Sequence, residues 1–348
     1  MADTRLQTDV AIVGAGPVGL FAVFECGMLG LKCHLIDTLE ALGGQCLALY
    51  PEKPIYDIPG MPKVMAGELI ARLAEQAAPF QPVMHLGQQV VSLTPVGTPS
   101  NAAWRLETSG GTEIEARAVI LAAGAGAFGP NRPPLAHIED YEGRSVFYLV
   151  SRREDFRDRR VVIAGGGDSA LDWVLSLAAV ARKIYVVHRR AKFRGAPESV
   201  ARMKALAEGG PEADRVVEIV VPYALHALEG RDGMLEAVVV STLKGETRRL
   251  EADALLPFFG LSMDLGPIAD WGLALDRHHI VVDPATCETG RAGIFAIGDI
   301  ASYSGKLKLI LSGFSEAAMA AHAIYKRVHP ERELHWEYST TKGVPNPN

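Results

Sequence analysis

The sequence has few cysteines, no long apolar run and no excess of positive charge, and each absence disfavours a class of protein. Only four cysteines occur in 348 residues, and none forms a C-x-x-C pair or a zinc-like spacing with histidine. No stretch approaches the roughly 18–20 apolar residues of a membrane helix, and the N-terminus lacks a basic segment followed by a signal-peptide core. The net charge of −6 disfavours a nucleic-acid-binding protein. We therefore expect a soluble, cytoplasmic protein with reduced thiols and no metal site, binding neither membranes nor nucleic acids.

Glycine, in contrast, is abundant, and many of the 35 glycines follow apolar segments directly. That placement is typical of phosphate-binding turns rather than of low-complexity sequence. The chain is long enough for two domains of ordinary size, and its 48% hydrophobic and 22% charged residues are normal for a globular protein.

The strongest local signal is a glycine-rich turn near the N-terminus. A buried parallel strand is expected over residues 10–13 and a helix over 17–29. The turn between them has the pattern G-x-G-x-x-G, with Gly14, Gly16 and Gly19. A second strand over residues 33–36 ends at Asp37, 23 residues beyond the first glycine. In this motif the backbone approaches a pyrophosphate at the helix N-terminus and the acid binds ribose hydroxyls. We therefore predict a dinucleotide site here; the alternative is a tight strand–helix turn without a ligand.

The same arrangement recurs in the middle of the chain. A strand is expected over residues 161–164, a helix over 169–180 and a second strand over 184–187. The turn between the first strand and the helix has the pattern G-x-G-x-x-A, with Gly165, Gly167 and Ala170. The second strand ends at His188, again 23 residues beyond the first glycine. The repeat predicts a second dinucleotide site.

Basic residues occupy the second site where the first has an acid. His188 is followed by Arg189 and Arg190, with Arg194 shortly after. A carboxylate would repel a ribose 2′-phosphate, whereas guanidinium groups bind it through charge-assisted hydrogen bonds. The second site therefore suits NADPH, and the first suits an adenosine with free ribose hydroxyls. A solvated basic turn is the alternative interpretation.

Three apolar segments indicate where one domain interrupts the other. Residues 118–124 form a strand at which the chain leaves the first domain, and residues 253–260 form the corresponding strand of the second. A third strand, over residues 293–300, ends in Gly298-Asp299 and returns the chain to the first domain. The fold class is therefore α/β, with two Rossmann-like FAD/NAD(P)-binding domains, the NADPH domain being inserted into the FAD domain. The predicted limits are 1–125 and 263–348 for the FAD domain and 126–262 for the NADPH domain.

Six motifs together resemble the two-dinucleotide-binding-domain flavoproteins, specifically the thioredoxin-reductase-like group. They are GAGPVG (14–19), GGQC (43–46), YDIPG (56–60), GGGDSA (165–170), HRRAKFRG (188–195) and GIFAIGD (293–299). One departure narrows the resemblance. Thioredoxin reductases carry a C-x-x-C disulfide upstream of the second glycine loop, where this chain has residues 147–153 without cysteine, and Cys46 has no partner nearby. Because a thiol–disulfide relay needs two sulfurs, the chain resembles the ferredoxin/flavodoxin–NADP⁺ reductases of this group.

The resemblance implies an enzyme, a ferredoxin–NADP⁺ reductase, in which hydride passes from NADPH C4 to flavin N5 and single electrons then pass to ferredoxin or flavodoxin. It implies no catalytic side chain beyond the flavin, a homodimer, and a C-terminal extension that covers the flavin. The flavin would be stacked by Tyr50 and Tyr338, and Asp299 would bind a ribityl hydroxyl or the pyrophosphate. A helix over about 315–328 would direct its N-terminus at the flavin C2 carbonyl.

The expected FAD contacts share positions with those of the family: Gly14, Gly16, Pro17, Val18, Gly19, Asp37, Gly44, Gln45, Tyr50, Val90, Phe128, Asp299 and Thr340, with Thr341 as the one-residue alternative to Thr340. The expected NADPH contacts lie in the second glycine loop and the basic turn: Gly165, Gly167, Asp168, Ser169, His188, Arg189, Arg190 and Arg194.

An acidic ferredoxin would need a basic docking surface. The candidates are residues 151–160, which contain five arginines diluted by three acids, and Lys306 with Lys308. Two other functions stay open on sequence grounds. One is an NADPH-dependent flavoprotein that reduces a quinone or another small molecule, and the other is a non-catalytic protein that responds to FAD and NADP.

Overall fold

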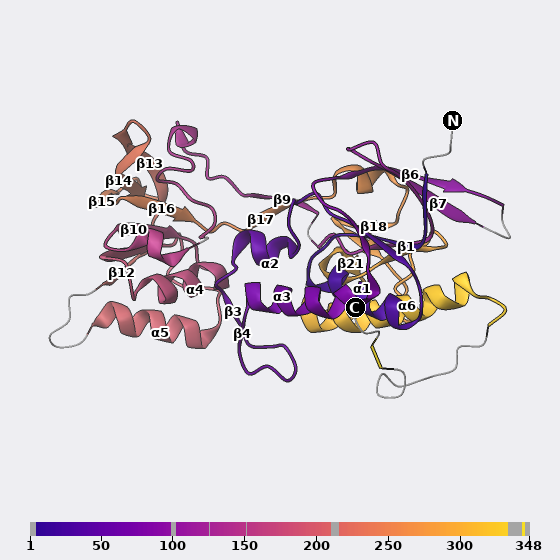
Figure 1. The fold of residues 1–348 in the computed structure, drawn as a ribbon. Coiled ribbons are helices and arrows are strands. Elements are labelled where there is room, and N and C mark those ends of the chain that lie inside the picture. The colour runs from indigo at the N-terminus through magenta and orange to yellow at the C-terminus, as the bar shows by residue number, and fades with distance from the viewer. Residues whose placement is uncertain are drawn as a thin grey trace. The chain divides into compact units, whose positions relative to one another are not determined.

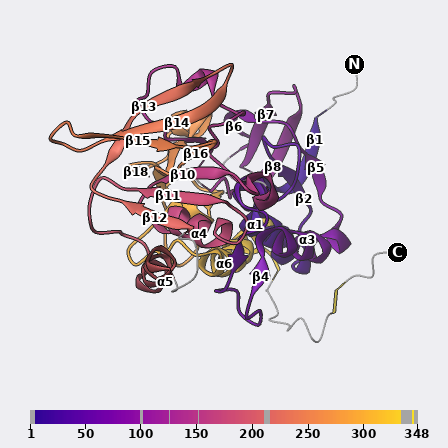
Figure 2. The ribbon, with the colours of Figure 1, turned by 90° about the vertical axis from the view of Figure 1, so that its left-hand side faces the viewer.

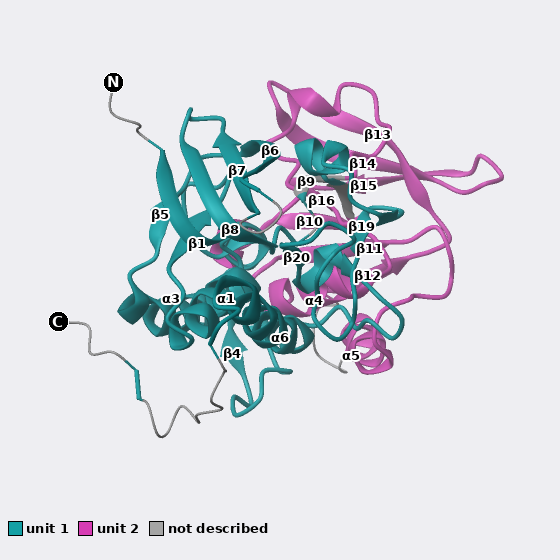
Figure 3. Ribbon diagram, turned by 90° about the vertical axis from the view of Figure 1, so that its right-hand side faces the viewer, with its two compact units in different colours: residues 1–128, 263–348 teal, residues 129–262 magenta. Residues whose placement is uncertain are grey.

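A computed structural model describes residues 5–98, 102–124, 126–150, 152–209, 216–332 and 343–344, with the backbone alone at 127–130 and 261–263. The chain forms two compact units (Figure 3). Unit 1 comprises residues 1–128 and 263–348, and unit 2 comprises residues 129–262. The chain passes from one unit to the other in β9 (Ala127–Pro130) and returns in β17 (Leu261–Asp264), and these two strands pair with each other.

Unit 1 contains a seven-stranded sheet in the order β5-β2-β1-β8-β7-β6, with β20 also paired to β8. Its strands are β1 (Leu6–Val13), β2 (Cys33–Ile36), β5 (Val83–His85), β6 (Val90–Val96), β7 (Ala103–Thr108), β8 (Glu113–Leu121) and β20 (Ile294–Ala296). The strands β5, β2, β1, β8 and β20 are parallel, whereas β6 and β7 add an antiparallel meander. Val13 at the end of β1 pairs with Ile36 and Leu121, so three parallel strands end at the same edge of the sheet.

Three helices cover one face of this sheet, with α1 (Pro17–Met28) between α3 (Ala66–Ala77) and α6 (Ile310–Val328) (Figures 1 and 3). Small residues allow α1 and α6 to approach closely. A Cβ on Gly313 of α6 would overlap the side chain of Val18 in α1. Short helices and strands complete the unit: α2 (Gly44–Leu49), β3 (Pro54–Ile55), β4 (Val64–Met65), β18 (Leu275–Asp276), β19 (His279–Val281) and β21 (Ala301–Ser302).

Unit 2 repeats this plan on a smaller scale, with a parallel sheet in the order β12-β11-β10-β16 and an antiparallel meander β13-β14-β15 (Figure 2). Its strands are β10 (Arg160–Ala164), β11 (Lys183–Val187), β12 (Val217–Val220), β13 (Ala224–Arg231), β14 (Met234–Ser241), β15 (Thr247–Glu251) and β16 (Ala254–Pro257), and its helices are α4 (Asp168–Leu177) and α5 (Pro197–Glu208). Within the described residues, no helix of either unit is long and apolar enough to cross a membrane.

The predicted α/β fold is confirmed, but several predicted element ends are wrong. β8 ends at Leu121, α4 at Leu177 and β16 at Pro257, each three residues before the predicted end. The strand predicted over 293–300 stops at Ala296, and a 3₁₀ turn, η6 (Gly298–Ile300), follows because Gly298 has a φ of +74°. The helix predicted from about residue 315 begins at Ile310. Gly313 and two nearby serines lower the helix propensity of this first turn, and the close packing of Gly313 on α1 is a tertiary contact that the pattern does not reveal.

Candidate nucleotide-binding sites

The first glycine loop joins β1 to α1 and has a conformation that only glycine allows at two positions. Gly14 has a φ of +113°, and a Cβ there would overlap the carbonyl oxygen of Ala122. A Cβ on Gly19 would overlap the carbonyl oxygen of Gly14. Gly16 differs, because a Cβ on it would meet nothing within 4 Å. The space in front of Gly16 is therefore open, and it lies at the first turn of α1.

The N-terminus of α1 has no side-chain cap, although the first turn of a helix leaves backbone N–H groups without intrahelical partners. Gly16 is the N-cap residue and Pro17 the first helical residue. Such uncapped N–H groups and the helix dipole attract phosphate. The open space at Gly16 and this helix end fit the pyrophosphate of a dinucleotide.

Asp37 follows β2 and is held against the glycine loop. One carboxylate oxygen accepts a hydrogen bond from the N–H of Ala15 at 2.6 Å, and the other accepts one from Leu39 at 2.8 Å. Each carboxylate oxygen has a second lone pair. The side chain is thus fixed at the end of the strand and can still accept hydrogen bonds from ribose hydroxyls.

The GGQC segment also packs on this loop. The N–H of Gly43 donates to the carbonyl of Ala15 at 2.8 Å, and a Cβ on Gly44 would lie 3.2 Å from the Cα of Gly16. Gln45 lies near Gly124, since a Cβ on that glycine would be 3.5 Å from its amide nitrogen. The structure therefore brings together the two glycine segments that the sequence separates by about 30 residues.

Tyr50 lies half-buried after α2, with its hydroxyl 3.8 Å from the sulfur of Cys46. Burial raises the pKa of Tyr50 well above its usual range, and the nearby Cys46 and Asp299 add to this shift. The phenol therefore stays protonated at neutral pH. The role of Tyr50 in flavin stacking stays a prediction.

The η6 turn is anchored by a buried network that sequence reasoning missed. Glu316 of α6 is only 2% exposed, and its carboxylate accepts hydrogen bonds from the N–H of Gly298 at 2.7 Å and the hydroxyl of Tyr303 at 2.6 Å. It also forms an ion pair with Lys306. The neighbouring Asp299 is exposed. The one sequence signal for such a network is the position of Glu316 among the small residues of the predicted helix.

This network corrects one prediction. Lys306 was expected to contribute to a basic docking surface, but its side chain is 7% exposed and its charge is compensated by Glu316. Lys308 is exposed, and its ammonium group hydrogen-bonds His279 at 2.6 Å. Burial lowers the pKa of His279, and the ammonium group of Lys308 lowers it further.

Of four further predicted flavin contacts, one lies apart from this cluster and three lie outside the described residues. Val90 is 4% exposed and packs in an apolar core of unit 1 that includes Leu106 and Ile268, as any core valine would. Phe128 belongs to β9, but its side chain lies outside the described residues, as do Tyr338 and Thr340 together with its alternative Thr341.

The second glycine loop, in unit 2, joins β10 to α4 in the same way. Gly165 has a φ of +156°, and a Cβ there would lie 2.7 Å from the carbonyl oxygen of Phe258. Gly167 is the N-cap of α4 without a side-chain cap, and a Cβ on it would meet nothing within 4 Å. Ser169 is exposed in the first turn of α4. This loop therefore also fits a pyrophosphate.

The basic turn after β11 is tied to the glycine loop and α4 by hydrogen bonds from two of its backbone N–H groups. The N–H of Arg194 donates to the carbonyl of Gly166 at 2.7 Å, and the N–H of Ala196 donates to the carboxylate of Asp168 at 2.7 Å. Asp168 thus organises the turn. The side chains of Arg189 and Arg190 are exposed, like that of Arg194, and none of the three has an ion-pair partner among the described residues. Three free guanidinium groups beside a glycine loop suit a phosphate ester.

His188 ends β11 and is buried beneath this loop. Its ring stacks on Phe193 with centroids 5.3 Å apart, and its Nε2 has no hydrogen-bond partner. Burial lowers the pKa of His188, and the charges of Arg194, Arg189 and Arg190 lower it further, while a backbone hydrogen bond with Lys192 opposes them. The imidazole is therefore neutral at pH 7.

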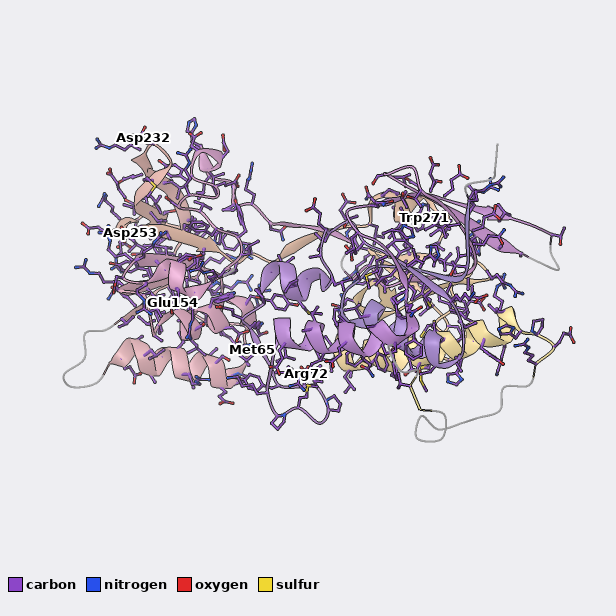
Figure 4. The ribbon with its side chains drawn as sticks, in the orientation of Figure 1. Met65, Arg72, Glu154, Asp232, Asp253 and Trp271 are labelled. Carbon is purple, nitrogen blue, oxygen red and sulfur yellow. The ribbon has the colours of Figure 1, made fainter. Side chains whose placement is uncertain are left out.

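The arginine run at 151–160 is mostly paired within unit 2, which weakens its predicted docking role. Arg157 pairs with Glu154 at 2.6 Å, and Arg160 pairs with Asp253 at 2.6 Å and with Glu251 at 2.7 Å. Glu154 and Asp253 are labelled in Figure 4. Arg152 and Arg153 have acidic partners at 3.6 and 3.8 Å.

Metal binding and disulfide formation can also be examined among the described residues. No group of three or more histidine, cysteine, aspartate or glutamate side chains that could hold a metal ion occurs among them. All four cysteines are buried and free, so no disulfide is formed within this part of the chain.

The chain is similar to several known proteins. Residues 8–323 match the pyridine nucleotide-disulphide oxidoreductase family. The ferredoxin--NADP reductase of Rhodospirillum rubrum is 61% identical over 342 residues, which cover 98% of either chain. That of Granulibacter bethesdensis is 63% identical over 341 residues, covering 98% of this chain and 95% of the relative. In fold, the chain is similar to thioredoxin reductase from Lactococcus lactis, with a TM-score of 0.78 at 23% identity over 93% of this chain and 99% of the other.

Proposed function

The chain belongs to the pyridine nucleotide-disulphide oxidoreductase family, and on that premise we propose that it is an FAD-dependent ferredoxin–NADP⁺ reductase. The observation that carries this proposal is the difference between the two glycine loops. One has a carboxylate at the strand end, and the other has a histidine followed by three unpaired arginines. The free, buried cysteines support it further, because a disulfide relay would need an accessible pair of thiols.

FAD, when bound, would supply the redox chemistry, which is hydride acceptance from NADPH and release of single electrons. The side chains and backbone of unit 1 bind and orient it. Gly16 and the first turn of α1 hold the pyrophosphate, and Asp37 accepts hydrogen bonds from the adenosine ribose. Asp299 lies in the η6 turn, which the hydrogen bond from Gly298 to Glu316 fixes to α6. Tyr50, whose already high pKa is raised further by burial, provides an aromatic surface without adding charge.

Unit 2 binds NADPH and selects it against NADH. Gly167 and the first turn of α4 hold the pyrophosphate, with Ser169 in that turn. Arg189, Arg190 and Arg194 form charge-assisted hydrogen bonds with the ribose 2′-phosphate, each of which contributes about 1.5–3 kcal/mol. Asp168 acts indirectly, because its carboxylate accepts a hydrogen bond from the N–H of Ala196 and so fixes the shape of the basic turn.

Ferredoxin is the electron acceptor that the relatives' names indicate. From the family resemblance we add flavodoxin as an alternative carrier, a homodimeric assembly and a cytoplasmic location. Analytical ultracentrifugation of the purified protein tests the assembly, for which a sedimentation mass of one chain would be the contrary result.

Rapid mixing with NADPH tests the reaction. We expect loss of flavin absorbance within the mixing experiment, and cytochrome c reduction that rises when ferredoxin is added. No loss of flavin absorbance would refute the enzyme and favour a nucleotide-responsive binding protein. If cytochrome c reduction does not rise with ferredoxin but a quinone is reduced, the electron acceptor would be a small molecule and not a protein.

A further inference from the structure

The Nε2 atom of His188 is an unexplained feature of the second glycine loop. Among the buried side-chain nitrogen and oxygen atoms of the described residues, it is the one that lacks a hydrogen-bond partner. An unsatisfied buried polar atom costs about 1–3 kcal/mol. Such a group in a native protein often marks a place where a ligand completes the hydrogen bonding.

The packing around the ring leaves Nε2 fixed at the glycine loop. A Cβ on Gly166 would lie 2.5 Å from Nε2, so the nitrogen edge of the ring faces the middle residue of the loop. Phe193 stacks on the ring, and a backbone hydrogen bond with Lys192 is the one contact that raises the pKa of His188. In unit 1 the corresponding place, at Ala15, is taken by the carboxylate of Asp37, where the adenosine ribose is expected.

The charged groups that surround the ring are mostly positive. Arg189, Arg190 and Arg194 come from the loop that follows β11, and they disfavour a proton on the imidazole. From α4, the carboxylate of Asp168 is engaged with the N–H of Ala196. From the turn after β12, Tyr223 donates only its backbone N–H to the carbonyl of His188. Without a ligand, nothing on these elements offers Nε2–H an acceptor.

We propose that the 2′-phosphate of NADP(H) binds together with a proton, which His188 takes up at Nε2, so that the preference for NADPH over NADH weakens as the pH rises. This inference rests on the NADPH site proposed above. The phosphate dianion neutralises the arginines that disfavour the imidazolium, and its oxygen accepts a hydrogen bond from the new Nε2–H. The proton comes from solvent, and the charge of the imidazole changes from 0 to +1.

The direction of the pH effect follows from linkage. The pKa of His188 is below its usual value in the free protein and is raised in the complex. The added affinity is therefore complete at low pH and is lost as the pH rises through the pKa of the complex, by up to about tenfold per pH unit. NADH lacks the phosphate and should show no such dependence.

Calorimetry on the flavin-loaded protein tests the proton directly, with 2′-AMP as the probe and 5′-AMP as the control ligand. At pH 7.5 the free 2′-phosphate is almost fully ionised, since its second pKa is about 6. Titrations in buffers of different ionisation enthalpy then report the protons bound. We expect uptake of a large fraction of one proton with 2′-AMP and none with 5′-AMP.

Two variants separate titration from shape. In His188→Gln the side-chain amide can still donate to phosphate but cannot titrate, so 2′-AMP should remain preferred while proton uptake disappears. His137→Gln removes an exposed histidine elsewhere in unit 2 and should leave the uptake unchanged. No uptake by the wild-type protein, or equal uptake by His188→Gln, would overturn the inference alone. Equal affinities for 2′-AMP and 5′-AMP at every pH would overturn the NADPH site and the inference with it.

Discussion

The two glycine loops share a backbone plan and differ in the residue that closes each of them. In unit 1, Asp37 at the end of β2 accepts a hydrogen bond from the N–H of Ala15, the middle residue of the loop. In unit 2, His188 at the same spacing places its ring edge against Gly166 and leaves Nε2 without a partner. The first arrangement is electrostatically complete, whereas the second gathers positive charge that only an anionic ligand can compensate.

The loops also differ in how closely the helix approaches the strand. Gly19 has no room for a methyl group, whereas the corresponding position in unit 2 is occupied by Ala170, which is buried. The phosphate turn is thus a requirement of the backbone in both units, while the strand end decides which nucleotide is bound.

The largest effect is expected from Gly19→Ala, which would impose on unit 1 the residue that unit 2 tolerates. Its Cβ would overlap the carbonyl oxygen of Gly14, a backbone atom that cannot move without opening the turn. We expect destabilisation of about 3 kcal/mol or more and loss of bound FAD, measured by urea unfolding and by flavin absorbance after gel filtration. The matched change Ala170→Gly in unit 2 should cost only about 1–2 kcal/mol. Equal destabilisation by both changes would contradict the difference in helix approach.

Next in size is Arg189→Ala combined with Arg190→Ala, which removes much of the positive charge of the second site. Each arginine is exposed and unpaired, so the fold should not depend on it. We expect KM for NADPH to rise about 100-fold, corresponding to two charge-assisted hydrogen bonds, and KM for NADH to change little. Steady-state kinetics with both cofactors measures this. Equal effects on NADPH and NADH would refute recognition of the 2′-phosphate.

A smaller and symmetrical pair of effects is expected from Gly16→Ala and Gly167→Ala. At both positions a Cβ meets nothing in the ligand-free protein, and both backbones have φ values, −70° and −98°, that alanine adopts. Stability should therefore change by less than about 1 kcal/mol, while each methyl group would meet the pyrophosphate of its own nucleotide at a cost of about 1–3 kcal/mol. Gly16→Ala should weaken FAD alone, and Gly167→Ala NADP⁺ alone, as measured by fluorescence and calorimetric titration. Loss of the other nucleotide in either variant would break the assignment of one nucleotide to each loop.

Sequence reasoning succeeded where local pattern determines structure. Both strand–turn–helix segments and the strand ends at Asp37 and His188 follow from apolar periodicity and glycine spacing. It failed where tertiary contacts decide. The early start of α6 depends on Gly313 packing against Val18, and Lys306 is buried because Glu316, ten residues later, compensates its charge. No spacing rule predicts that Lys306, between Gly305 and Leu307, turns inward while Lys308, between two leucines, stays exposed.

The smallest effect concerns acid, and it contrasts β2 with β11. His34 of β2 lies 3.0 Å from His85 of β5, both are buried, and burial lowers the pKa of each; the proximity of His85 lowers that of His34 further. At the position of His34, unit 2 has Tyr185, whose phenol is neutral at any acid pH and whose pKa is raised further by burial. In acid, therefore, the unfolded chain binds protons at His34 and His85 more readily than the folded protein does.

The sign of this effect is fixed by linkage. The folded pKa values lie below the unfolded value of about 6.5, so stability is complete above that pH and is lost as the pH falls toward the folded values. Hydrogen exchange should show the amides of β2 and β5 losing protection between about pH 6.5 and 5 before those of β10 and β11. In His34→Gln combined with His85→Gln this difference should shrink, because the amide pair can keep a hydrogen bond without titrating. An unchanged pH dependence in that variant would mean that other groups cause the acid sensitivity, and His188 in unit 2 would be the first to test.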